Sequence, residues 1–262
     1  MKRIAACALA LWALAGPAAA GQACVDTLPT PAAVERGLRL AQRTRDRLAA
    51  ADAEVALVAR VGRDLSRHGL RYSHLGFAWR DHPRGAWFVV HELNACGAAT
   101  SDLHDEGLGN FFLDDLFDHE ALLLLPPPAT QARLSALLAA GPALALHGRH
   151  YNLVAHPFST RYQNSNQWVL EMLAAALAPD GAVASRAAAQ RWLREAGYRP
   201  TTIRLGTLER LGARIARANI AFDDHPPEHR FAGRIDTVSV ESVADFLAAH
   251  APGTHRLIIR LE

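Results

Sequence analysis

Residues 161–171 limit the possible structures of this chain more than any other segment, because a polar loop there turns directly into a helix. Ser165 falls in the first helical turn, among unpaired backbone N–H groups at the positive end of the helix dipole. Two interpretations stay open. Ser165 is a nucleophile whose oxyanion is stabilised by the helix N-terminus, or Asn164 is an ordinary N-cap and Gln167 completes a capping box. The helix itself is predicted from apolar residues at the helical period: Trp168, Val169, Met172, Leu173, Ala176 and Leu177.

The first 20 residues have the order of a secretory signal peptide. Lys2 and Arg3 precede an apolar segment, residues 4–15, and small residues lead to cleavage after Ala20 or Ala23. The apolar segment is too short to cross a bilayer comfortably, and we expect no transmembrane span elsewhere. The sequence therefore predicts an exported protein, periplasmic or secreted. Lipidation of Cys24 is an alternative, although the residues before it lack the large aliphatic side chain of lipoprotein signals.

The charges of the mature chain balance. Removing Lys2 and Arg3 leaves 26 of the 28 basic residues against 26 acidic ones. A neutral chain gives no electrostatic reason to expect a nucleic-acid partner.

Two of the three cysteines remain after the leader is removed. Cys7 leaves with the leader, whereas Cys24 and Cys96 stay. An even pair in an exported chain predicts a disulfide that ties the mature N-terminus to the domain, with two unpaired thiols as the alternative.

Two segments alternate in the manner of strands and form a predicted hairpin. They are residues 72–79 and 86–93, joined by a loop that contains Asp81, Pro83 and Gly85. In a symmetric hairpin His74 lies opposite His91, and the two rings share a face. A slip of one residue would replace His91 by Glu92 at that place.

The remaining pattern predicts an α+β chain with a core over residues 21–182 and a C-terminal α+β extension over residues 183–262. Residues 94–117 are expected to form an acidic loop, whose aromatic string at 106–112 either lines a cleft or packs a surface loop. Helices are predicted at 29–68, 130–140, 186–196, 207–218 and 241–250, and short strands at 121–125, 151–154, 219–222 and 256–261.

His74, His91 and Ser165 supply the residue types of nucleophilic catalysis. The reaction needs a base in hydrogen-bond reach of the hydroxyl and a third group that orients the base. These three residues, with Glu92 as the alternative to His91, are therefore the candidates for such a site.

The strings Ser73-His74-Leu75-Gly76-Phe77, then His91, then Asn164-Ser165-Asn166-Gln167-Trp168-Val169 resemble the circularly permuted, NlpC-type papain-like superfamily, which includes lecithin retinol acyltransferase. In that superfamily the histidine strand precedes the nucleophile helix. Residues 151–171 also resemble an uncharacterised family of exported bacterial proteins known only as a domain of unknown function. The resemblance implies a papain-like core, an antiparallel sheet packed on the helix that begins at Ser165.

The same resemblance implies a hydrolase or acyltransferase that acts on an amide or ester carbonyl. Its substrate would be a small peptide or an acyl compound, and cell-wall peptide is one such substrate class. Ser165 would attack, and His74 would carry the proton. The matched order of parts implies that His74 lies within about 4 Å of Ser165 and that His91 or Glu92 orients its ring. Tyr162, Gln163 or Asn164 would line the oxyanion hole or cleft. The superfamily's nucleophile, however, is a cysteine. Serine has a much higher pKa than a thiol, so a catalytically inactive binding protein is the alternative, and a purely structural role for the capped helix is a third.

Three histidines at 147, 150 and 156 have a spacing that could suit zinc. Gly148 and nearby prolines argue against a helix there, and no cysteine pair or carboxylate spacing completes the set. We therefore expect no metal and no other cofactor. The oligomeric state is open.

Overall fold

A computed structural model describes residues 28–96, 98–114 and 116–261 of the chain. The predicted leader, the cleavage site and Cys24 lie outside these residues, so export, lipidation and the pairing of Cys24 with Cys96 stay predictions. Within the described residues, no helix has the length and apolar character needed to span a membrane.

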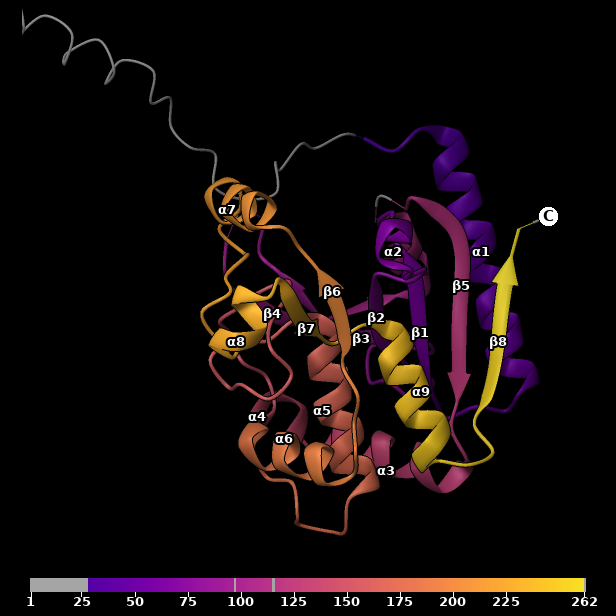
Figure 1. The fold of residues 1–262 in the computed structure, drawn as a ribbon. Coiled ribbons are helices and arrows are strands. Elements are labelled where there is room, and N and C mark those ends of the chain that lie inside the picture. Colours follow the sequence, from indigo (N-terminus) through magenta and orange to yellow (C-terminus); the bar gives the residue numbers. More distant parts are fainter. Residues whose placement is uncertain (1–27, 97, 115, 262) are drawn as a thin grey trace, which may run out of the picture.

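One antiparallel sheet of six strands organises the α+β fold (Figure 1). Its order is β4-β3-β2-β1-β5-β8, and every neighbouring pair is antiparallel. The strands are β1 (Val55–Val61), β2 (His74–Trp79), β3 (Phe88–Asn94), β4 (Ser101–Gly107), β5 (Asp118–Leu125) and β8 (His255–Arg260).

Helices cover both faces of this sheet and create two separate apolar clusters (Figure 1). On one face, α1 (Pro31–Ala50) and α2 (Leu108–Leu113) pack on side chains such as Ala78 and Val89. On the other face, α5 (Ser165–Leu177) packs on β2 and β3, with Trp168 edge-on to Phe77 at 5.6 Å between ring centroids. This second face also receives α3 (Pro128–Ala139), α6 (Arg186–Glu195) and α9 (Val240–His250).

The prediction of one helix over residues 29–68 is wrong in its second half. Helix α1 ends at Ala50, Asp52 adopts a left-handed conformation with φ 46°, and β1 follows. All seven residues of β1 are buried, because this strand lies inside the sheet with a helix layer on each face. A strand buried on both faces reads as a continuous apolar segment, which lacks the alternation that distinguishes a strand from a helix. A short 3₁₀ helix, Ser66–His68, closes the region.

Residues 94–117 are also more regular than expected, since they hold β4 and α2 rather than a loop. The acidic β4 is the edge of the sheet and is only partly buried, so its sequence has little apolar signal. Phe111 and Phe112 are fully buried under α1, which places the aromatic string in the core and not in a surface loop.

Residues 183–262 contribute to the main body as well as forming a small sheet of their own. Strand β8 completes the large sheet beside β5, and α6 and α9 share the apolar cluster of α5. The small sheet pairs β6 (Thr201–Arg204) with β7 (Arg234–Thr237), and the short helices α7 (Thr207–Ala216) and α8 (Pro227–Phe231) lie beside it. The predicted strands at 151–154 and 219–222 do not form, and the first is reduced to a single bridge between Tyr151 and Gln163. A four-residue helix, α4 (Pro142–Ala145), precedes that bridge.

Gly76 in β2 allows the first histidine strand to approach the second. A Cβ on Gly76 would lie 2.8 Å from Cγ1 of Val89 and 3.0 Å from Cβ of His91. We therefore expect Gly76→Ala to lower the free energy of unfolding by about 1 to 3 kcal/mol, as overpacked cores do. Urea denaturation measures this effect. Gly109→Ala is the control, because its Cβ would make only an ordinary 3.5 Å contact in a helix, and an equal loss there would contradict the steric explanation.

Candidate functional site

The N-terminus of α5 is built as a capped helix start. Asn164 Oδ1 accepts a hydrogen bond from the backbone N–H of Gln167 at 2.8 Å, and Asn164 Nδ2 donates to Thr237 Oγ1 at 3.0 Å. The N-cap prediction is confirmed. The Gln167 side chain does not complete the capping box. Its Nε2 donates to Pro157 O and to Glu171 Oε1 instead. Ser165 is therefore held firmly in the first turn, 7% exposed.

The hydroxyl of Ser165 lies beside the phenol of Tyr151 and interacts with it. Tyr151 is buried, and burial, with the nearby charge of Glu92, raises the pKa of its phenol well above the usual value. A phenol with a raised pKa keeps its proton near neutral pH. The partner of Ser165 is therefore a poor proton acceptor.

Glu92 lies on the same side of the sheet as Ser165. Its Oε1 accepts a 2.7 Å hydrogen bond from Ser101 Oγ, which also lies 3.2 Å from His147 Nε2. Burial raises the pKa of Glu92 to about 8, against a smaller opposing effect of Ser101 and Arg186. Its second oxygen, Oε2, is buried and has no hydrogen-bond partner among the described residues. Asn166 Oδ1 is a second buried acceptor of this kind at the start of α5.

The two predicted histidines lie on the opposite face of the sheet. His74 Nε2 and His91 Nδ1 are 2.7 Å apart, and His91 Nε2 lies 3.1 Å from Glu106 Oε1. The rings pack against Phe111 of α2, with centroid distances of 5.9 Å from His74 and 5.5 Å from His91. Burial lowers the pKa of both imidazoles, and for His74 the charge of Arg60 adds to the effect. The prediction that the rings share a face is confirmed, but they meet diagonally and not directly across the hairpin, because Phe77 pairs with Val90.

The expected approach of His74 to within about 4 Å of Ser165 does not occur. Side chains alternate across a strand, so Leu75 and Phe77 face α5 whereas His74 faces α2. The sheet therefore lies between the histidine pair and Ser165. Of the four residues predicted to be catalytic, the structure brings Glu92 to the Ser165 face and leaves His74 and His91 on the other.

Gln163 has a structural role that the sequence did not reveal. Its Nε2 donates to Glu171 Oε2 at 2.6 Å and to Leu146 O at 3.0 Å, while its Oε1 accepts from the N–H of Gly148. Both ends of the amide are thus occupied. Tyr162 is half-buried, and its carbonyl accepts from Arg186. Their predicted oxyanion role remains a prediction.

A buried ion pair fixes this loop to the helices. Glu171 Oε2 lies 2.8 Å from Arg186 Nε, and Gln190 Nε2 donates to Glu171 Oε1 at 2.8 Å. Burial raises the pKa of Glu171 while Arg186 opposes that shift. The sequence held one signal for this, since Glu171 is the single charge within the apolar segment 168–177. Tyr151, Ser101 and His147 carried no comparable signal.

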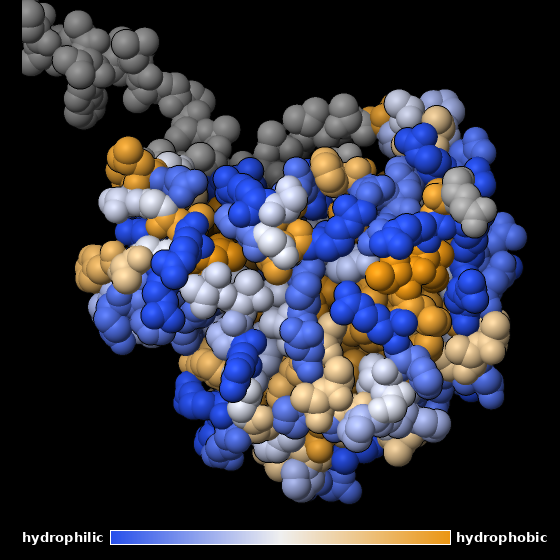
Figure 2. All heavy atoms as spheres, turned by 45° about the vertical axis from the view of Figure 1, so that its right-hand side comes forward, coloured by the Kyte–Doolittle hydropathy of each residue, from blue (hydrophilic) through white to orange (hydrophobic). Residues whose placement is uncertain are grey.

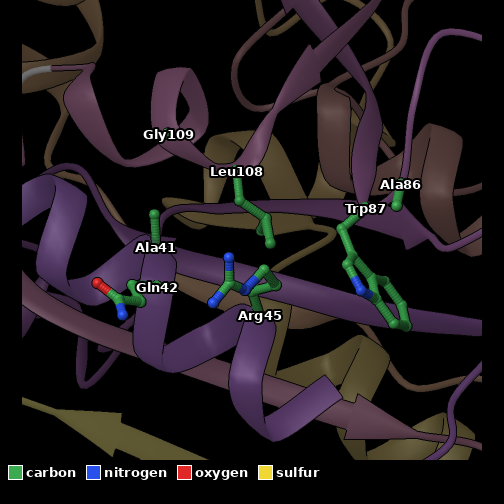
Figure 3. A pocket seen from close by; sticks show the side chains of 7 residues that line it. All are labelled: Ala41, Gln42, Arg45, Ala86, Trp87, Leu108 and Gly109. Carbon is green, nitrogen blue, oxygen red and sulfur yellow. The ribbon is translucent and has the colours of Figure 1, made fainter. Parts of the chain in front are cut away.

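Two cavities of about 320 Å³ lie on opposite faces of the sheet. The first lies between α1, α2 and the start of β3, with Trp87, Leu108 and Arg45 in its wall (Figure 3). The second is a groove on the face of Ser165, lined by Trp79, Val90, Leu103, Leu138 and Ala143 and by the polar pair His82 and Asp105. Leu103 of this groove is directly opposite Glu92 in the ladder of β3 and β4. Among the described residues, no group of three or more His, Cys, Asp or Glu side chains is arranged to hold a metal ion.

Residues 47–247 match the model of a family described as uncharacterised proteins conserved in bacteria, DUF2145. The chain belongs to this family. The match spans β1 to β5 of the large sheet, α5 and the small sheet of the DUF2145 chain, and ends before β8. It confirms the resemblance to a domain of unknown function. Among curated proteins and solved structures, none matches the chain.

Proposed function

We propose that this DUF2145 chain is a peptide-binding protein whose site is the α5 N-terminus and the adjoining groove. One observation carries the proposal: the neighbour of the Ser165 hydroxyl is Tyr151, a phenol that keeps its proton, and both imidazoles of the predicted site lie across the sheet. A serine nucleophile requires a base that accepts its proton. Ser165 is therefore a polar group of a binding site and not an activated nucleophile.

The groove suits an uncharged peptide. Trp79, Leu103 and Leu138 provide an apolar wall for a side chain. Glu92, with a pKa of about 8, is largely protonated near neutral pH, so the buried carboxyl on the strand beside Leu103 adds no charge next to the groove. Ligand sites of this kind combine an apolar wall with a few placed polar groups.

The layering supports a papain-like origin. In the papain-like proteins that this chain resembles, histidine strands precede a helix that packs its N-terminus against an antiparallel sheet. This chain has the same order of elements. We propose that the chain derives from the papain-like architecture without its thiol chemistry. We also propose that it is exported, on the strength of residues 1–20 of the sequence.

Binding is tested by calorimetry with N-acetyl-leucyl-leucinamide, a blocked apolar dipeptide. Leu103→Arg places a charge in the groove and is expected to weaken binding by about tenfold or more, which corresponds to about 1.4 kcal/mol. Leu28→Arg is the matched control, because Leu28 is 89% exposed and lies outside the groove. Equal affinities of the wild type and Leu103→Arg would refute the groove as the site.

A hydrolase is the second candidate, and the pKa of Glu92 favours it. A carboxyl that titrates near pH 8 lies in the range of catalytic acids and bases. Ser165 Oγ would bond to the substrate carbonyl carbon as its proton passed by way of Tyr151 to ionised Glu92. The bond from that carbon to the amine or alcohol would then break, and the leaving group would take the proton back. Water would cleave the resulting Ser165 ester by the same proton path, which releases the acid and restores the hydroxyl.

Labelling with a fluorophosphonate probe separates the two candidates. We expect no Ser165-dependent labelling at about pH 7 or about pH 9, on either side of the Glu92 pKa of about 8. Ser165→Ala is the control for probe reaction elsewhere. Labelling that rises with pH through this range and disappears in Ser165→Ala would establish the hydrolase and contradict the binding proposal.

A further inference from the structure

Helix α7 presents its apolar face to solvent instead of to the protein. Leu208 and Leu211, three residues apart on one side of the helix, are 82% and 57% exposed. The opposite side packs inward, where Ala213 contacts the apolar cluster of the small sheet. A surface helix normally turns its apolar side to the core, so this orientation requires an external partner.

A third apolar side chain lies at the same end of the molecule. Phe231 at the end of α8 is 75% exposed, with the Arg230 guanidinium 5.0 Å from its ring centroid. The N–H of Leu205, just before α7, donates a 3.0 Å hydrogen bond to the carbonyl of Gly233, two residues after α8. Figure 1 places α7 and α8 on the same side of the molecule, away from β8 and with α7 above α8, and Figure 2 shows orange side chains among blue ones on that side.

Arginines surround these apolar side chains. Residues 204–217 contain Arg204, Arg210, Arg214 and Arg217 against one acid, Glu209. The Glu209 carboxylate accepts from the N–H of Gly206, and Arg210 donates to Leu205 O. Within the described part of the chain, Arg204, Arg214 and Arg217 are exposed and form no ion pair. The surface thus combines exposed leucines with arginines that form no ion pair within the described part of the chain.

We propose that this α7 surface binds an anionic lipid bilayer, with Leu208, Leu211 and Phe231 in the interfacial region. The exposed arginines then contact phospholipid phosphates. A helix with exposed apolar side chains and arginines around them is the structure that binds such interfaces. The positive charge of the surface favours an anionic bilayer over a second copy of this chain. Two copies that met through this surface would place the same arginines against each other, and like charges repel.

Cosedimentation of the full chain with vesicles tests the proposal. We expect binding to phosphatidylcholine vesicles that contain phosphatidylglycerol, and much weaker binding to phosphatidylcholine alone. The triple variant Arg204→Gln, Arg214→Gln, Arg217→Gln should bind on the order of a hundredfold more weakly, since each arginine near an anionic surface contributes about fivefold. The matched control, Arg36→Gln, Arg39→Gln, Arg47→Gln, removes the same charge from α1 and should bind as the wild type does.

The apolar part is tested with Leu208→Ser, Leu211→Ser, Phe231→Ser, and Leu28→Ser serves as the control on another exposed leucine. These side chains are exposed, so the thermal unfolding midpoint should not fall, and vesicle binding should weaken by at least about tenfold. Equal binding to both kinds of vesicle, no binding to either, or a dimer in sedimentation equilibrium that the serine variant disrupts would each overturn the proposal.

Discussion

Replacing Arg186 by methionine is expected to lower the free energy of unfolding by about 3 to 5 kcal/mol, because it leaves a buried carboxylate without its counter-charge. Glu171 has no exposed surface, and the Arg186 guanidinium also donates to the carbonyls of Thr160 at 3.0 Å and Tyr162 at 2.8 Å. Methionine fills a similar volume but carries no donor. The loss combines an uncompensated buried charge with two carbonyls that lose their partner.

Chemical denaturation followed by circular dichroism measures this loss. Arg191→Met is the matched control, since Arg191 belongs to the same helix and is exposed, and we expect a change within about 0.5 kcal/mol. The double variant Arg186→Met, Glu171→Gln removes the unpaired charge and should recover part of the stability. A single variant as stable as Arg191→Met would show that the ion pair contributes nothing net.

The second large effect is expected for Glu92→Gln, and it depends on pH. Burial raises the pKa of Glu92 from 4.5 to about 8, so the folded state holds a proton that the unfolded state releases between these values. The stabilising contribution of this proton is complete below pH 4.5 and is lost as the pH rises toward about 8. Each pH unit in this window costs about 1.4 kcal/mol, and the whole window about 4 to 5 kcal/mol.

Glutamine has the shape of the protonated acid and does not titrate, so its relative advantage should grow with pH. We expect the variant and the wild type to be similarly stable near pH 4.5 and the variant to be more stable by several kcal/mol near pH 8. Unfolding at a series of pH values measures the difference. A constant difference across this window would contradict the raised pKa. Glu54→Gln, a half-buried residue at the start of β1, serves as the control for loss of one carboxylate.

The sequence predicted the elements around the site better than it predicted the site. The hairpin of β2 and β3, the start of α5 and its Asn164 cap were all recovered, because alternation and capping are local signals. For the residues of β1 the sequence predicts a helix instead of a strand, since burial on both faces removes the alternation.

The face on which each residue lies was harder to predict. His74 and Leu75 are neighbours in sequence, yet one contacts Phe111 of α2 and the other belongs to the cluster of α5. The alternation along β2 shows which residues share a face but not which face α5 covers. That depends on connections between segments distant in sequence. A shift of one residue in the predicted register places Glu92 where His91 is expected, and Glu92 does face α5. Arg186 could not be paired with Glu171 from sequence, because no periodicity links two separate helices.

The position of β8 has a consequence for the order in which the fold forms. Strand β5 lies between β1 and β8, and β8 is the last strand of the chain, more than 100 residues after its partner. During synthesis, β1 to β5 can pair before β8 exists, which leaves the leucine-rich β5 as an open sheet edge. Such edges recruit other strands and promote aggregation. Residues 255–260 are made late. The growing chain is therefore most prone to aggregate with other chains in the interval before β8 pairs with β5.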